Sequence, residues 1–359
     1  MGNRTIVPFG PQHPVLPEPI HLDLVLEDET VVEAIPRIGY IHRGLEKLVE
    51  KRDFQQYTYV AERICGICSF MHGMGYCMSL ESIMGVEIPE RAKFLRTVWA
   101  EFSRLHSHLL WLGLLADAFG FESLFMQSWK LREEVLDIFE ETTGGRVIFS
   151  VCDIGGVRKD IGRETFEKIL KALDKMEKEL KETAAVFLND ATVKLRTKGV
   201  GKLSRQAAFD LGAVGPMARA SGIEMDMRTQ GYAAYGHLEF KPIVDQDGDC
   251  YARTKVRLNE MFQSMDLIRQ CIGLMREGEI KVKVTGSPNG EHFTRLEQPR
   301  GEVLYYAKAN GTKFLDRVRV RTPTFANVPA LLETLKSCSL ADVPILILTI
   351  DPCISCTER

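Results

Sequence analysis

The sequence lacks a hydrophobic run that is long enough to span a membrane. Its most apolar stretch, residues 109–121, contains Asp117 and is shorter than the roughly 20 residues that a bilayer-spanning helix needs. The first residues contain no apolar segment of the kind found in secretory signal peptides. We therefore expect a cytoplasmic protein that lies at the periphery of the cytoplasmic membrane only through partner subunits.

The chain also lacks an excess of either charge. Lys and Arg number 46 against 49 Asp and Glu, which gives a formal net charge of −3. This balance argues against nucleic acid as a partner, since nucleic-acid-binding proteins carry clustered basic residues. Hydrophobic residues make up 45% and charged residues 26%, which is typical of a globular protein rather than a disordered one. No repeat or linker divides the chain, so we expect a single domain over residues 1–359.

The hydrophobic pattern is mainly helical. Three long segments have apolar residues at helical spacing: residues 89–112, 163–193 and 253–275. Two pairs of short segments are typical of β-hairpins: residues 21–26 with 30–35, and residues 303–307 with 317–320. A short helix is predicted from Asn327. The predicted fold class is α+β and predominantly α, with long buried helices and small antiparallel sheets in the N- and C-terminal regions.

Four of the nine cysteines form two Cys-x-x-Cys pairs, Cys65 with Cys68 and Cys353 with Cys356. Spacing of this kind lets both sulfurs of a pair reach one metal from a single turn. Four thiolates are a soft ligand set that suits zinc, an iron–sulfur cluster, copper(I) or nickel. The apolar residues 343–350 predict that the second pair is carried into the core to face the first. The other cysteines are spaced irregularly and are expected to be small buried hydrophobes.

Spacing alone leaves the metal open. A structural zinc site usually gathers its cysteines in compact knuckles, whereas these pairs are 288 residues apart. An iron–sulfur cluster with four cysteine ligands is chemically possible. Two independent redox motifs are less natural, because neither pair lies at the strand–helix junction of a thioredoxin-like unit. The residues therefore predict a metal site built from both pairs without naming the metal.

The residues around both pairs resemble the two signatures of the [NiFe] hydrogenase large subunit. The first signature is Arg-x-Cys-Gly-x-Cys-x-x-x-His over residues 63–72, and the second is Asp-Pro-Cys-x-x-Cys-x-x-Arg over residues 351–359. Four further segments resemble the branch that is related to the catalytic core subunit of respiratory complex I: residues 10–14, 39–48, 155–160 and 248–253. The short length looks most like an energy-converting, Ech-type membrane-bound hydrogenase.

This resemblance implies a nickel–iron centre held by the four thiolates. Cys65 and Cys353 would be terminal ligands of nickel, and Cys68 and Cys356 would bridge to an iron that carries CO and cyanide. The implied reaction is the reversible reduction of protons to H2, coupled through partner subunits to ferredoxin and to ion translocation. Cys353 would be the first base, since the pKa of a thiol lies near enough to neutral for proton exchange.

The resemblance also implies roles for residues that surround the centre. His72 would donate an N–H to the Cys68 sulfur and tune the metals. Arg300 would place a fixed positive charge beside their open position, with Asp351 as its ion-pair partner. Thr324 would hydrogen-bond a cyanide. The alternatives are purely structural: a core histidine, a turn arginine and a capping aspartate.

Glu18 lies in a proline-rich segment and resembles the family's N-terminal glutamate, which passes protons outward from the terminal cysteine. A carboxyl group near a buried metal site suits such a relay, because its surroundings can tune its pKa. The alternative is a surface glutamate in a loop.

Two departures from the family's pattern concern acidic and metal-binding residues. The usual His-Asp-His segment is here His-Ser-His at residues 106–108, so an acidic residue is missing. The usual C-terminal histidine, which in many relatives binds Mg2+ together with a glutamate matching Glu46, is here Arg359. A guanidinium has no lone pair for a metal, so the implied Mg2+ site on Glu46 is in doubt.

The cysteines outside the two pairs are scattered along the sequence and form no second quartet. This chain is therefore expected to carry no iron–sulfur cluster. The resemblance implies a small subunit with a [4Fe–4S] cluster, ferredoxin-like and antiporter-like membrane subunits, soluble ferredoxin, and a maturation endopeptidase if an extension follows Arg359. Three other functions remain as alternatives: a quinone-site subunit of the complex I type, a sulfane-sulfur reductase, and a zinc or metal-storage protein. The intact quartet favours the hydrogenase over the first two.

Overall fold

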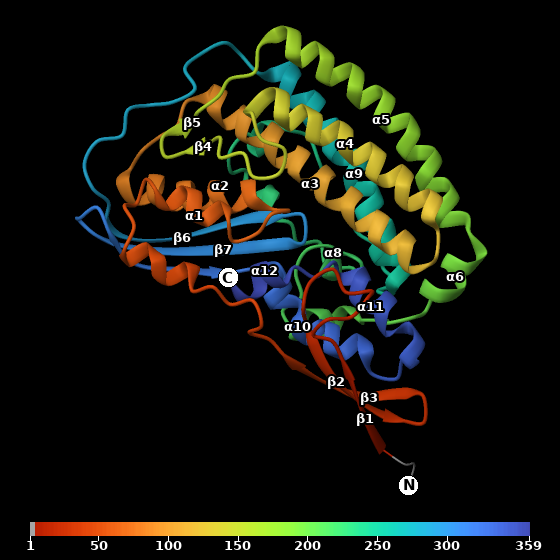
Figure 1. Cartoon of the computed structure of the whole chain (residues 1–359). Helices are drawn as coiled ribbons and strands as arrows, with labels where there is room; N and C mark the ends of the chain where they lie inside the picture. The colour runs from red at the N-terminus through yellow and green to blue at the C-terminus, as the bar shows by residue number, and fades with distance from the viewer. Residues whose placement is uncertain (1–3) are drawn as a thin grey trace.

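Long helices form the largest layer of the structure, a computed structural model that describes residues 4–359. Helix α3 (Glu90–Ala118) packs against α4 (Glu122–Thr143) and α9 (Cys250–Leu274), and α5 (Arg163–Asn189) lies on α4 and α9 (Figure 1). Almost every turn of α3 is buried, because its apolar residues recur on several faces rather than on one stripe. The helix predicted over residues 89–112 is therefore confirmed.

Two other predicted helices differ from the prediction at one end, where an aspartate caps the start of a helix. The helix predicted over residues 163–193 ends at Asn189, since the Asp190 side chain accepts the amide N–H groups of Thr192 and Val193 and starts a separate helix, α6 (Ala191–Thr197). Helix α9 begins at Cys250 rather than at Arg253, because Asp249 caps it in the same way.

Two antiparallel three-stranded sheets complete the architecture. The first contains β1 (Arg4–Phe9), β2 (His21–Glu27) and β3 (Thr30–Arg37), and the second contains β6 (Asn289–Gln298), β7 (Gly301–Asn310) and β8 (Leu315–Arg321). Helix α2 (Ser69–Met84) lies on β6 and β7. Both predicted hairpins and the predominantly helical α+β class are confirmed, although strands β1 and β6 had not been predicted.

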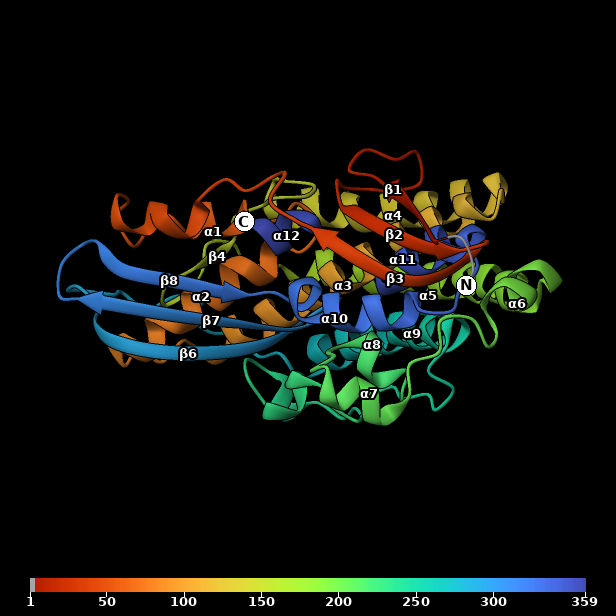
Figure 2. The same cartoon turned by 90° about the horizontal axis from the view of Figure 1, so that it is seen from below.

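The C-terminal region returns between these sheets. Helix α10 (Pro323–Leu335) begins at Pro323, before the predicted Asn327, because proline suits the first turn of a helix. The apolar residues 343–350 form the buried helix α11 (Val343–Ile350), which contacts α3 and α9. In both views the last helix, α12 (Ile354–Glu358), lies between the two three-stranded sheets (Figure 1 and Figure 2).

Shorter elements connect these parts: η1 (Leu45–Glu50), α1 (Tyr57–Glu62), β4 (Cys152–Asp153), β5 (Gly156–Val157), α7 (Arg205–Asp210), α8 (Pro216–Arg219), η2 (Met227–Gln230), η3 (Tyr235–His237) and η4 (Leu340–Asp342). Across residues 4–359, no helix combines the length and the apolarity that crossing a membrane requires.

Candidate metal centre

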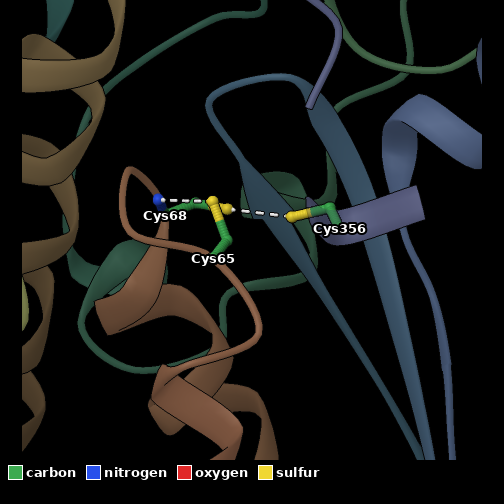
Figure 3. Close-up of side chains that lie close together, drawn as sticks. All are labelled: Cys65, Cys68 and Cys356. Carbon is green, nitrogen blue, oxygen red and sulfur yellow. Dashed lines mark hydrogen bonds between the residues drawn. The ribbon is translucent and has the colours of Figure 1, made fainter. Parts of the chain in front are cut away.

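The fold brings the two cysteine pairs together in the core. The Cys65 and Cys353 sulfurs are 3.3 Å apart, and the Cys68 and Cys356 sulfurs are also 3.3 Å apart. All four thiols are free, and none is more than 2% exposed. Figure 3 shows the Cys65 and Cys68 side chains facing that of Cys356 across the gap between the two segments. The predicted convergence of pairs from distant parts of the chain is thus present.

Each pair occupies the turn that starts a helix. Cys68 precedes α2, and its amide N–H donates to the Cys65 sulfur at 3.4 Å. The second pair repeats this geometry, since the amide N–H of Cys356 donates to the Cys353 sulfur at 3.4 Å at the start of α12. Asp351 ends α11 in the left-handed region with φ of 57°, which turns the chain and aims Cys353 at the first pair.

The quartet and its surroundings fit a bound metal centre. The sulfurs of Cys65, Cys68 and Cys356 lie within 4.8 Å of one another, as soft ligands of one site would. Buried polar atoms without a hydrogen-bond partner among the described residues also lie on the side chains around the quartet: Gln298 Oε1, Arg300 Nη1 and Asp351 Oδ2. Such atoms are rare in folded proteins, so they indicate that a further polar group belongs there.

His72 contacts the second cysteine pair rather than the first. Its Nε2 lies 3.2 Å from the Cys356 sulfur, and its Nδ1 lies 2.6 Å from the Tyr305 hydroxyl. The prediction that His72 donates to Cys68 is therefore corrected. The backbone N–H of His72 bonds the carbonyl oxygen of Cys68 one turn earlier, and the side chain projects across the gap. Tyr305 was not predicted, although it lies at a buried alternating position of β7.

Arg300 and Asp351 form the ion pair that the resemblance implied. Arg300 donates from Nε to the Asp351 carbonyl oxygen at 2.8 Å and from Nη2 to its carboxylate at 2.9 Å. Burial favours a lower pKa for Arg300, but the Asp351 carboxylate and the nearby thiols outweigh it and raise that pKa. The guanidinium therefore keeps its charge although it is only 4% exposed.

The turn that carries Arg300 depends on two glycines. Gly301 has φ of +129°, and a Cβ added to it would lie 2.7 Å from the Gly215 nitrogen. Gly215 likewise has φ of +63° and lies against the carbonyl of Arg300. Only residues without a side chain allow this approach, so both glycines fix the position of the guanidinium.

Thr324 and Glu18 both hold the segment around Cys353. Thr324 Oγ1 accepts the amide N–H of Cys353 at 3.0 Å. The Glu18 carboxylate accepts the amide N–H groups of Ile354 and Ser355 and the Ser355 hydroxyl. Glu18 therefore lies at the start of α12, directly beside the second pair.

Glu46 is held by arginines in a way that does not fit Mg2+. Its Oε1 accepts from Arg359 Nε at 2.8 Å and from the Val320 amide at 2.9 Å, and its Oε2 accepts from Arg319 at 2.9 Å. Burial favours a higher pKa for Glu46, but the bond from Arg359 and these other donors outweigh it and lower that pKa. Mg2+ needs available oxygen ligands, whereas both oxygens here already accept from guanidinium groups.

A buried ionic cluster behind the turn was not predicted. Its members have no more than 1% exposure: Glu101, Arg104, Arg219, Asp226, Arg228, Glu260 and Glu297. Arg219 joins Glu260 and Glu297 at 2.7 Å each. Burial, followed by the Asp226 carboxylate, raises the pKa of Glu297 to about 7. Because Glu297 lies near the end of β6, just before the turn that carries Arg300, the cluster anchors that turn. Its residues come from separate segments, and no local pattern marks them.

The histidine-rich segment 106–108 lies within α3 next to this cluster. His108 Nε2 is 2.9 Å from the Glu260 carboxylate. Burial lowers the pKa of His106 to about 3, so its ring is neutral at pH 7. Ser107, which stands where the family's pattern has an aspartate, is buried, and its hydroxyl has no partner among the described residues.

Comparison with known proteins finds two matching families. Residues 118–287 and 282–359 match the 49-kDa subunit of respiratory-chain NADH dehydrogenase, and residues 43–117 match nickel-dependent hydrogenase. The chain is similar to the membrane-bound hydrogenase subunit alpha of Pyrococcus furiosus, with 38% identity over 98% of this chain and 87% of the relative. The carbon monoxide-induced hydrogenase of Rhodospirillum rubrum is 39% identical over 98% of this chain and 99% of the relative.

Among solved structures, a chain of the membrane-bound sulfane sulfur reductase, an archaeal respiratory membrane complex, is similar with a TM-score of 0.95. Its sequence is 30% identical, and the match covers 99% of both chains.

Proposed function

We propose that this chain is the catalytic subunit of an energy-converting [NiFe] hydrogenase. The premise is that the chain belongs to the oxidoreductase family that includes nickel-dependent hydrogenases and the 49-kDa subunits of complex I. The proposed reaction is the reversible conversion of two protons and two electrons into H2, coupled through partner subunits to ferredoxin and ion translocation. The observation that carries the proposal is the convergence of four buried, free thiols on one site.

The cofactor of the proposed enzyme is a nickel–iron centre whose iron carries CO and cyanide. Cys65 and Cys353 would be its terminal nickel ligands, and Cys68 and Cys356 would bridge the two metals. When bound, this centre supplies the redox-active position at which H2 is cleaved or formed. The unpartnered Arg300 Nη1 is a donor that is available to the CO and cyanide ligands, which can only accept hydrogen bonds.

The residues around the quartet move protons and orient sulfurs. Cys353 takes or releases a proton, and Glu18 exchanges it with the outside, because the Glu18 carboxylate already contacts the two residues after Cys353. His72, oriented by Tyr305, fixes the sulfur of Cys356. Arg300 supplies a permanent positive charge that stabilises developing negative charge beside the quartet.

Electrons require another subunit in this proposal. Among the described residues, the remaining cysteines are buried and belong to no group of three or more metal-ligating side chains: Cys77, Cys152, Cys250, Cys271 and Cys338. We infer three kinds of partner: a small subunit with a [4Fe–4S] cluster, ferredoxin as the redox partner, and antiporter-like membrane subunits. We also infer that residues 1–359 of this chain form one domain. The relatives named above as membrane-bound proteins support attachment through partner subunits.

A sulfane-sulfur reductase is the second candidate, because a chain of such a complex has the same fold at a TM-score of 0.95. The two proposals differ in what the site reduces. Protons need no binding pocket beyond the metals. A substrate made of linked sulfur atoms would need space beside the quartet.

Metal analysis combined with infrared spectroscopy of the purified complex tests the hydrogenase proposal. We expect one nickel and one iron in this chain and bands of metal-bound CO and cyanide. Cys353→Ser should remove nickel and the bands. Cys338→Ser is the matched control, since Cys338 is buried outside the quartet and its replacement should leave both unchanged. Zinc alone, or sulfane-sulfur reduction without H2 turnover, would reject the proposal.

A further inference from the structure

A short surface segment, residues 39–46, contacts the last helix along its length. The amide N–H groups of Gly39 and Ile41 donate to the two carboxylate oxygens of Glu358 at 2.6 and 2.5 Å. His42 Nδ1 lies 2.5 Å from the Glu358 carbonyl oxygen, and Glu46 pairs with Arg359. This segment, which we call the clasp, therefore holds the end of α12 in place.

Within the clasp, Arg43 contacts both cysteine segments at once. Its Nη1 donates to the Arg63 carbonyl oxygen at 3.0 Å, and its Nη2 donates to the Ile64 carbonyl oxygen at 2.9 Å. The same Nη2 donates to the Ser355 carbonyl oxygen, also at 2.9 Å. Ile64 directly precedes Cys65, and Ser355 directly precedes Cys356.

The guanidinium geometry makes this contact directional. The group is planar and carries five N–H donors in a fixed fork, so three acceptors from two backbone segments can be set in one relative arrangement. The acceptors are backbone carbonyls rather than side chains, and their positions determine where the next residue's Cα lies. A displacement of either segment by a fraction of an ångström breaks at least one bond.

We propose that Arg43 is a positioning residue that sets the separation of the two cysteine pairs by fixing the backbone before Cys65 relative to the backbone before Cys356. The coupling of the two segments does not depend on a metal. The consequence for the metals rests on the proposed function: thiolates held at a fixed separation keep the centre bound and fix the electronic state of its iron.

Hydrogen–deuterium exchange of the whole purified complex tests the coupling directly. In Arg43→Gln we expect amide exchange to rise roughly tenfold in both segments, residues 63–68 and 353–359, because three bonds from a charged donor are lost. Arg43→Lys should give an intermediate rise, since an ammonium is a point donor that cannot span three carbonyls. The infrared bands of metal-bound CO and cyanide should shift in Arg43→Gln.

Arg63→Gln is the matched control. Arg63 is a neighbouring arginine that follows α1, and its guanidinium donates to the carbonyl oxygen of Tyr59 in that helix, so its side chain does not join the two segments. The Arg63→Gln variant should leave amide hydrogen exchange in residues 353–359 at the wild-type rate.

Wild-type exchange in Arg43→Gln, or a rise in one segment alone, would overturn the proposal. If Arg43→Gln does not assemble, Arg43→Lys decides: wild-type exchange in both segments overturns the proposal, and a joint rise supports it. If the wild-type complex contains no nickel, the proposed function fails, while the exchange result still decides the role of Arg43.

Discussion

Replacing Glu18 with glutamine should separate proton transfer from metal binding. One oxygen of Glu18 accepts the amide N–H groups of Ile354 and Ser355, and the other accepts the Ser355 hydroxyl. A glutamine carbonyl oxygen can keep both amide bonds, and its NH2 group can donate to the same hydroxyl. The start of α12 should therefore stay in place. The amide cannot take up a proton near neutral pH, so the proposed relay is interrupted.

The two effects differ strongly in size. Exchanging a charged acceptor for a neutral one weakens each bond by about 1 kcal/mol, and solvent around the partly buried side chain reduces this further. A positioned acid or base contributes roughly 10²- to 10⁴-fold to a rate, which corresponds to about 3–5 kcal/mol of activation free energy. We therefore expect Glu18→Gln to lower H2 turnover at least about a hundredfold and to change Tm little.

The assay is H2 evolution and oxidation by the purified complex with an artificial electron carrier, together with nickel per chain. Ser355→Ala is the matched control, since it removes one donor to Glu18 and keeps the carboxyl group. It should retain most of the turnover. Wild-type turnover in Glu18→Gln with nickel fully bound would remove Glu18 from the relay and refute the reasoning.

Three further predictions concern stability. The pKa of Glu46 is lowered, so its contribution to the free energy of unfolding is present above its ordinary pKa of 4.5 and is lost as pH falls. Glu46→Gln should therefore lose less stability than the wild type when the pH is lowered. Chelation of Mg2+ should change the stability of neither protein. Burial raises the pKa of Glu62 from 4.5 to about 7. Its contribution to the free energy of unfolding is therefore complete below pH 4.5 and is lost as pH rises through 7. By ~1.36 kcal/mol per pKa unit, the stability of the wild type relative to Glu62→Gln should fall by about 3 kcal/mol across this window. Gly301→Ala should destabilise the fold by about 3 kcal/mol, because the new Cβ meets the Gly215 backbone.

Each of these results has a defined contrary outcome. Loss of stability on Mg2+ removal would show that the arginines at Glu46 do not replace a divalent ion. Parallel stability curves for wild type and Glu62→Gln would place the Glu62 pKa near its ordinary value. For Gly301, the comparison is Gly311→Ala. Gly311 also has positive φ, but a Cβ there meets nothing closer than 3.8 Å, so equal Tm losses would rule out the backbone contact as the cause.

The sequence predicted the parts of the fold that depend on local patterns. The helical spacing of apolar residues predicted α3, and the strand-like segments at residues 303–307 and 317–320 predicted the hairpin of β7 and β8. Helix ends were less accurate because single aspartates, Asp190 and Asp249, override the periodicity by capping the next helix. The convergence of the cysteine pairs followed from the signatures and from the apolar run before Cys353.

Features that depend on distant contacts were missed. Hydropathy places arginines and carboxylates at the surface, whereas Arg219, Glu260 and Glu297 compensate one another in the core. The predicted hydrogen-bond partner of His72 was wrong for a related reason. Sequence spacing links His72 in α2 to Cys68, which directly precedes that helix, but the side chain reaches the sulfur of Cys356, which is 284 positions away.

The separation of the cysteine pairs along the chain has a consequence for timing. A ribosome that adds roughly 5–20 residues per second needs about 15–60 s to extend the chain from Cys65 to Cys353, which lies 288 positions later. During this interval the nascent protein carries half of the quartet with nothing opposite it. Closure of α12 over the first pair therefore comes only after these residues have been made, and any metal that needs all four sulfurs is captured only after that closure.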